Sequence, residues 1–243
     1  MAQMFREEES YPDNGQRANF VFMGYPYRPP LPKDDYGTVV KQLQEELPVR
    51  FWYFLDEVST AEMMRKVWRA ILRSDLSVFD VSGGNANVSF ELGLAVAKDR
   101  RCITMLKNGE PNPLGSADLG YAERMEYTSA VSLREKLREF VLAKNSGLRK
   151  LDAISYEITA DDGSTNRDEV LKGLTSLVGK IFNGKSIAMS GAKTIMGSQS
   201  LAVAALQALR SADIVKIEGS KRGSKYVFTD KWVYHDHEVS GDV

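Results

Sequence analysis

Residues 74–97, SDLSVFDVSGGNANVSFELGLAVA, contain the pattern that decides the fold class. An apolar run ends at Asp80, two glycines follow at positions 83 and 84, and a helical apolar pattern then surrounds Glu91. A strand, a glycine turn and a helix in this order are typical of one unit of a parallel α/β sheet. The stretch also raises a question of function, because it sets one carboxylate among apolar neighbours just beyond a predicted strand end.

The same alternation extends to both sides of this stretch. Apolar runs predict strands at 19–25, 49–55, 76–81 and 102–106. Helical spacing predicts helices at 34–47, after a capping-box pattern at 59–62, and at 87–98. Strands separated by helices with short links predict an α/β fold, an open parallel sheet with helices on both faces. A short strand, MEYT, and the helix SLREKLREFVLAK complete this domain.

A change of character divides the chain after this domain. We expect a flexible N-terminal tail at 1–18, the α/β domain at 19–146, a linker at 147–166, a second domain at 167–234 and a tail at 235–243. The linker is predicted because Asp, Gly, Ser, Thr and Asn dominate its second half. Three short helices and then the hairpin pattern VKIEGSKRGSKYVFT predict a small winged helix-turn-helix domain after it.

The second domain is basic. Between Arg167 and Trp232 there are 11 Lys or Arg and 5 Asp or Glu, a local charge of about +6. Lys193 and the hairpin residues Lys221, Arg222 and Lys225 are the candidate contacts to nucleic-acid phosphates. The predicted recognition helix at 198–214 is nearly all apolar or small, so we expect little base readout. Docking of a protein or dimerisation is the alternative use of this domain.

Composition excludes several classes of function. The 243 residues have a formal net charge of -1, with 43% hydrophobic and 27% charged residues, so no global field favours nucleic acid or membrane. Cys102 is the single cysteine, which excludes an internal disulfide, and His235 and His237 are the only histidines, so we expect no metal site. We find no secretory pattern or long apolar stretch and expect a cytoplasmic protein without a membrane partner. Phosphate-binding glycine fingerprints are absent, and no cofactor is expected.

The carboxyl ends of the strands are where an open α/β sheet binds ligands. Two such ends carry polar or glycine-containing segments, Met23-Gly24-Tyr25 and Asp80-Val81-Ser82-Gly83-Gly84-Asn85. Glycines allow a ligand to approach the backbone closely, and Asn85 or Asn87 can cap the helix that follows. Glu91 then falls in the first or second turn, where the helix N-terminus favours its ionised form by roughly 0.3–1 kcal/mol. The alternative is that Glu91 only complements the helix dipole.

The stretch at 74–97 resembles the segment aDl.iaDlsg.NpNV.yELGiA.a of nucleoside 2-deoxyribosyltransferase-like and TIR-like nucleotide glycohydrolase proteins. The resemblance extends over residues 19–143 and implies a deoxyribosyltransferase or flavodoxin-like fold. It also implies that Glu91 is a nucleophile on the anomeric carbon of a nucleotide, and that Met23, Gly24, Tyr25 and Asp80 line the pocket. The matched motif positions are Asn85, Asn87, Val88, Glu91, Leu92, Gly93 and Ala95.

One departure from this family bears on the substrate. Deoxyribosyltransferases carry an aspartate six residues before the glutamate to assist proton transfer at the base, and this chain has Asn85. Asp80 is the candidate for that acid, with a structural role as the alternative. Nicotinamide leaves NAD from a cationic state and needs no acid, so the sequence favours NAD over a nucleoside phosphate.

The combination of domains resembles the toxic effectors of bacterial retron-type anti-phage systems. It implies an N-glycosidase held silent by a nucleic-acid or nucleoprotein partner, as a homo-oligomer or as part of a defence complex. The alternatives are a non-catalytic, nucleotide-sensing and DNA-binding regulator, and a scaffold that assembles a defence oligomer.

Overall fold

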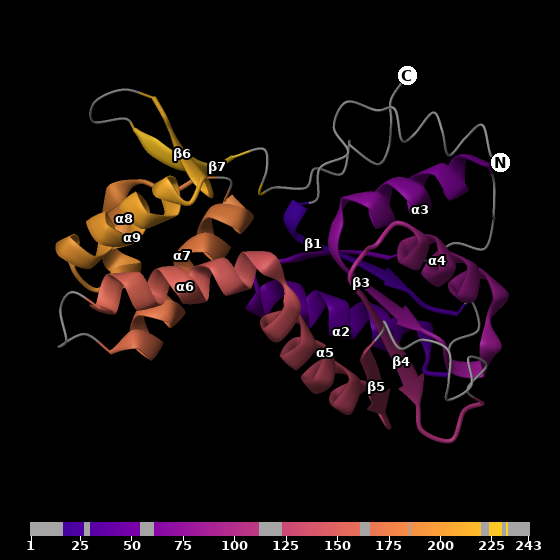
Figure 1. The fold of residues 1–243 in the computed structure, drawn as a ribbon. Helices are drawn as coiled ribbons and strands as arrows, with labels where there is room; N and C mark the ends of the chain where they lie inside the picture. The colour runs from indigo at the N-terminus through magenta and orange to yellow at the C-terminus, as the bar shows by residue number, and fades with distance from the viewer. Residues whose placement is uncertain are drawn as a thin grey trace.

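The computed structural model of the protein describes residues 17–26, 30–53, 61–111, 123–160, 166–184, 186–219, 224–229 and 232. Its first part has the predicted alternation of strands and helices (Figure 1). The elements of this part are β1 (Arg17–Gly24), α2 (Lys33–Glu46), β2 (Arg50–Trp52), α3 (Ala61–Arg73), β3 (Ser74–Asp80), the single turn η1 (Ser82–Gly84), α4 (Ala86–Ala97), β4 (Cys102–Lys107), β5 (Glu123–Tyr127) and α5 (Ala130–Lys144).

The five strands form one parallel sheet in the order β2-β1-β3-β4-β5. The predicted α/β fold with an open parallel sheet is therefore confirmed. This order is one of the two common doubly wound arrangements, and it reverses direction between β1 and β3. The two central strands are buried along their length, as expected for strands covered on both faces.

Two helix layers cover the sheet (Figure 1). On one face Phe20, Phe22 and Phe79 pack under α3 and α4. On the other face Leu76 and Val78 pack under α2 and α5, in a core that continues into the C-terminal helices. The alternation of side chains along each strand sorts its residues between these two cores.

The C-terminal part is a helical unit with a small hairpin (Figure 1). Its two strands are antiparallel, and Ile187 forms an isolated bridge with Tyr226. The elements are α6 (Ser146–Ala160), α7 (Arg167–Gly184), α8 (Met189–Met196), α9 (Gln199–Ser211), β6 (Val215–Glu218) and β7 (Lys225–Phe228).

The linker predicted at 147–166 needs correction, because most of it is helix α6. Leu148, Leu151 and Ile154 recur at helical spacing and are buried, so this helix joins the two parts through a shared core. A side chain on Gly147 would lie 2.6 Å from the Trp232 ring and 2.8 Å from the Ala18 carbonyl. Residues 161–165 lie outside the described residues. Their polar composition led to the prediction of a linker that also included residues 147–160, which are helical.

The predicted boundary of the N-terminal tail needs only a small correction. β1 begins at Arg17, two residues before the predicted start of the α/β domain at 19, because Arg17 is buried and pairs with Ser74 of β3. The remaining residues of that tail, the capping-box residues Ser59 and Thr60, and the tail at 235–243 lie outside the described residues. None of the described helices is both long and apolar enough to cross a membrane.

Candidate functional site

The candidate site lies at the carboxyl edge of the sheet, where the strand order reverses. Gly24 at the end of β1 pairs with Phe79, and Asp80 at the end of β3 pairs with Met105. Crevices at such a reversal are the usual ligand sites of doubly wound sheets. The turn η1 and the start of α4 follow directly from β3 and bring Glu91 to this edge.

The glycine turn and the helix cap form as expected. Gly83 and Gly84 have φ angles of 70° and 73°, which side chains other than glycine rarely adopt, and both are exposed. The side chain of Asn85 accepts hydrogen bonds from the backbone N–H of Asn87 at 2.9 Å and of Val88 at 3.2 Å. Asn85 is therefore the N-cap of α4, and Asn87 is exposed in its first turn.

Glu91 lies in the second turn of α4, with its carboxyl group directly over Gly24. A Cβ atom on Gly24 would be 2.7 Å from Glu91 Oε2 and 2.9 Å from Cδ1 of Phe79. Because residues alternate along β1, Phe22 and Gly24 face the α3 and α4 layer together. The absence of a side chain at position 24 is what leaves room for the carboxyl group.

The surroundings of Glu91 are apolar. The Phe22 ring lies 5.6 Å from the Phe79 ring and is stacked at 5.5 Å on Trp52. Glu91 forms no hydrogen bond or ion pair with another residue in the described part of the chain. Burial raises the pKa of Glu91 to about 7.

This pKa differs from the expectation of a fully ionised carboxylate. The helix N-terminus favours the charged form by only about 0.3–1 kcal/mol, and its effect is largest in the first turn. A pKa raised from 4.5 to about 7 corresponds to about 3 kcal/mol in favour of the neutral form. The cost of removing the charge from water therefore outweighs the helix dipole, and Glu91 titrates near neutral pH.

Asp80 is held in a different environment. It is fully buried and accepts hydrogen bonds from Tyr36 Oη at 2.5 Å and Tyr127 Oη at 2.6 Å on Oδ2. On Oδ1 it accepts from the Ser82 hydroxyl at 2.6 Å and the Ser82 backbone N–H at 3.0 Å. A carboxylate has about four acceptor positions, and four donors occupy them here.

The geometry places Asp80 and Glu91 on opposite faces of the sheet. Asp80 follows Leu76 and Val78 in the alternation of β3, and Tyr36 and Tyr127 belong to the core on the α2 and α5 side. Burial raises the pKa of both tyrosines, so both remain hydrogen-bond donors. This arrangement suits an anchoring carboxylate and does not favour the predicted role of Asp80 as an acid beside Glu91.

Other predicted pocket residues are also directed away from Glu91. Met23 is buried in the α2-side core, and Tyr25 stacks on Tyr36 with ring centroids 5.0 Å apart. The Ser82 hydroxyl accepts a hydrogen bond from the Lys107 backbone N–H at 2.8 Å, which ties the end of β3 to the end of β4. Of the residues predicted around Glu91 at the end of β1, Gly24 alone among the described residues is placed against it.

Three residues of this edge were not singled out by the sequence. Tyr36 and Tyr127 donate hydrogen bonds to Asp80, and the Phe79 ring lies next to Gly24. A polar tip on an otherwise apolar ring is the feature that could have identified the two tyrosines, since a buried phenol needs a hydrogen-bond partner. Sequence alone gives no way to pair them with Asp80, because they lie 44 and 47 positions from it.

The predicted nucleic-acid contacts are only partly described. Lys193 in the last turn of α8 and Lys225 at the start of β7 are exposed. Lys221, Arg222, His235 and His237 lie outside the described residues. Within the described ranges, no group of three or more His, Cys, Asp or Glu side chains could hold a metal ion.

Comparison with known proteins gives no match, either among protein-family models or among curated proteins. The case for a function therefore rests on the site itself, and above all on Glu91.

Replacing Gly24 by alanine is expected to destabilise the protein by about 1–3 kcal/mol, because the new Cβ would overlap Glu91 Oε2 and crowd the Phe79 ring. The flexible carboxyl group would move toward water, so its pKa should fall toward the ordinary value of glutamate. Urea unfolding and an NMR titration of the Glu91 carboxyl group measure the two effects. Gly93→Ala is the matched control, since nothing lies within 4 Å of a Cβ there and alanine favours a helix. Similar losses in both variants would contradict the contact.

Proposed function

We propose that the α/β domain cleaves the N-glycosidic bond of a nucleotide, with Glu91 acting on the sugar carbon. The observation that carries this proposal is a carboxyl group without a partner among the described residues, set over Gly24 where the strand order reverses. Structural carboxylates removed from water are normally paired or hydrogen-bonded, as the fully buried Asp80 is, whereas Glu91 is partly buried and has no described partner. A strongly raised pKa in an apolar setting is typical of a functional carboxylate.

The chemistry requires a negative charge near the anomeric carbon. As the bond to the base breaks, the sugar acquires oxocarbenium character, and a carboxylate stabilises that positive charge or attacks it. A carboxylate surrounded by apolar rings is poorly solvated, so its attraction to a developing cation is stronger than in water. With a pKa of about 7, a large fraction of Glu91 is ionised at neutral pH.

The substrate class follows from the lack of an acid beside Glu91 among the residues that the structure describes. Asp80 lies on the other face of the sheet, and donors fill its acceptor positions. A neutral purine or pyrimidine needs protonation to leave, whereas nicotinamide leaves NAD as a neutral molecule from a cationic state. NAD is therefore the substrate we propose first, and a nucleoside phosphate second.

We further propose that residues 167–234 form a winged helix-turn-helix that docks nucleic acid or a nucleoprotein partner. The order of elements supports it: α7, a single bridge residue at Ile187, α8, α9 and the β6–β7 hairpin. Exposed Lys193 and Lys225 supply positive charge on this unit. The whole chain would then be a toxic effector of an anti-phage system, restrained in a defence complex or homo-oligomer.

A second candidate is a nucleotide sensor that does not cleave its ligand. It is favoured by the core shared between the two parts, in which Leu148, Leu151 and Ile154 of α6 join both. Packing of this kind allows binding at the sheet to alter the C-terminal unit. An enzyme would release the free base from its nucleotide, whereas a sensor would bind the nucleotide and leave it intact.

The proposed activity is tested by incubating the purified full chain with NAD and with a panel of nucleoside phosphates. We expect free nicotinamide, separated by chromatography, and at least about a 1,000-fold loss of its release in Glu91→Gln, because the amide removes the charge that stabilises the transition state. The rate for the wild type should rise with pH through about 7 as Glu91 ionises.

The outcomes separate the candidates. Release of a base that persists in Glu91→Gln would remove Glu91 from the mechanism. Tight binding of NAD without any release, with nucleic acid present or absent, would favour the sensor over the enzyme.

A further inference from the structure

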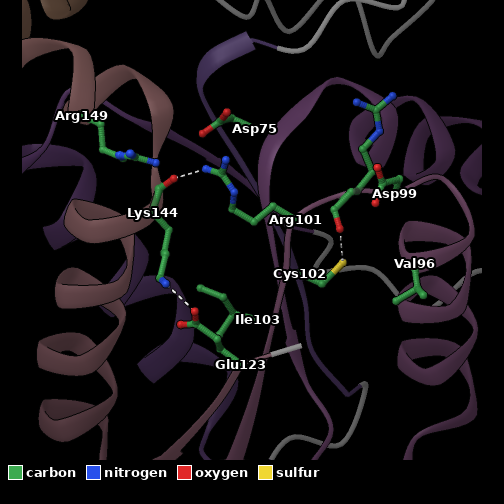
Figure 2. Close-up of a pocket in the computed structure, with 10 residues that line it drawn as sticks. Asp75, Val96, Asp99, Arg101, Cys102, Ile103, Glu123, Lys144 and Arg149 are labelled. Carbon is green, nitrogen blue, oxygen red and sulfur yellow. Dashed lines mark hydrogen bonds and ion pairs between the residues drawn. The ribbon is translucent and has the colours of Figure 1, made fainter. Parts of the chain in front are cut away.

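A cavity of about 790 Å³ lies at the opposite, amino edge of the sheet (Figure 2). It is formed where β3, β4 and β5 begin, between the C-terminal end of α4 on one side and the junction of α5 and α6 on the other. Its volume is within the range of about 300–1,000 Å³ that is usual for small-molecule sites. Neither Glu91 nor Asp80 lines it.

Arginines from separate elements converge on this cavity. Figure 2 shows Arg101, just before β4, and Arg149, in α6, with side chains that point toward one another. Arg101 donates a hydrogen bond to the Lys144 carbonyl, which carries only part of a negative charge at the end of α5. Arg149 is exposed and forms no hydrogen bond or ion pair with another residue that the structure describes. Two like charges that face one another are held at a cost unless an anion lies between them.

A third arginine adds to this excess of positive charge. Arg100 also lines the cavity, and its Nε is buried without a hydrogen-bond partner among the described residues. Burial lowers the pKa of Arg100, and the neighbouring carboxylate of Asp99 offsets this only in part. Arg100 thus adds a third, partly buried guanidinium group to the lining of the cavity.

The other carboxylates of the cavity already have partners. Asp75 accepts a hydrogen bond from the Ser146 backbone N–H at 2.7 Å and so caps the start of α6. Glu123 accepts from the Lys144 ammonium group, which makes these two charges a pair. Asp75, Asp99 and Glu123 supply three negative charges to the lining, and Arg100, Arg101, Lys144 and Arg149 supply four positive ones, so the cavity keeps an excess of one positive charge.

We propose that this cavity binds the phosphate group of a small phosphorylated molecule of about nucleotide size. Guanidinium groups bind phosphate through paired hydrogen bonds, and Arg101 and Arg149 point toward one another across the cavity (Figure 2). Val96 and Ile103 give the cavity an apolar surface, against which the non-phosphate part of the ligand would pack. A recess between two helix layers suits a compact ligand better than a nucleic-acid backbone, which needs a continuous surface.

The proposal is tested by titrating the full chain with inorganic pyrophosphate in a calorimeter at constant ionic strength. We expect saturable binding and a higher melting temperature. Arg149→Gln should weaken binding about tenfold or more, since it removes a charge-assisted contact. Because Arg149 has no described partner to lose and faces Arg101 (Figure 2), this variant is expected to be at least as stable as the wild type.

Lys150→Gln is the matched control, because Lys150 is the next residue of α6, is equally charged and exposed, and does not line the cavity. It should change the affinity by less than about twofold. Equal losses in both variants, or no binding of pyrophosphate, would overturn the proposal. So would tight binding of a short DNA duplex through Arg149 without binding of pyrophosphate. Binding should be unchanged in Glu91→Gln, so this test is independent of the proposed N-glycosidase.

Discussion

Replacing Glu91 by glutamine is expected to raise the free energy of unfolding near pH 8 by about 3 kcal/mol. In the folded protein burial raises the pKa of Glu91 to about 7, whereas in the unfolded chain water restores its ordinary value. The folded state therefore binds the proton more tightly. The stability that this proton confers is fully present below the unfolded pKa and is lost as pH rises through about 7. Glutamine is neutral at every pH and avoids that loss.

Urea unfolding of both proteins at several pH values between about 4 and 8 measures this effect. The difference between them should be small at the acid end and should grow as pH rises. Glu135→Gln on the exposed surface of α5 is the control for the substitution itself and should change the free energy of unfolding by less than about 0.5 kcal/mol. A constant difference between wild type and Glu91→Gln across the range would mean that Glu91 is not desolvated as the structure indicates.

This prediction connects stability with the proposed function. The charge that destabilises the fold at high pH is the charge that cleavage of the N-glycosidic bond would use. A residue that reduces stability while it serves chemistry is common in active sites. Glu91→Gln should therefore be more stable and inactive, which a purely structural glutamate would not produce.

Replacing Asp80 by alanine is expected to lower the free energy of unfolding by about 3–5 kcal/mol, one of the largest losses available to a single substitution here. The variant removes the acceptor of four hydrogen bonds and leaves the hydroxyls of Tyr36, Tyr127 and Ser82 without it in a buried place. The Tyr36 and Tyr127 hydroxyls, 2.7 Å apart, can still bond each other, which limits the loss. Thermal and urea unfolding measure the change.

Variants of the two tyrosines and a control at Asp99 complete the test of Asp80. Tyr36→Phe and Tyr127→Phe each remove one donor and should cost about 1 kcal/mol. Asp99→Asn is the control, because Asp99 is exposed and asparagine tolerates its positive φ of 52°. A loss for Asp80→Ala no greater than that of Asp99→Asn would contradict the anchoring role. Glu91 should keep its raised pKa in Tyr36→Phe, since the two groups lie on opposite faces.

Most of the α/β part could be predicted because each element carries its own local pattern. The apolar runs before Gly24 and Asp80 predict buried strands, and the glycines at 83 and 84 predict a turn that their positive φ angles confirm. The region around α6 was predicted less well. Its apolar residues adjoin a polar stretch, so composition suggested a linker where packing into a core shared by both parts of the chain stabilises a helix.

The candidate site shows a different limit. The sequence predicts Glu91 near Met23, Gly24, Tyr25 and Asp80, because the carboxyl ends of parallel strands share one edge of the sheet, and of these Gly24 is found against Glu91. It does not predict that Asp80 turns away. All residues of β3 are buried, so the strand has no alternation of polar and apolar residues that would reveal which face each one occupies.

The parallel α/β architecture, the glycine turn and the position of Glu91 in the first or second turn of its helix could be predicted from the sequence, because these depend on neighbours along the chain. The protonation behaviour of Glu91, the partners of Asp80 and the approach of Arg101 to Arg149 at the amino edge of the sheet (Figure 2) depend instead on tertiary packing. These properties depend on how much water each group keeps and on which distant charges come near it. The hydration of each group and the charges near it are set by residues that are far apart in the sequence. These residues become neighbours only after the sheet and its two helix layers have packed.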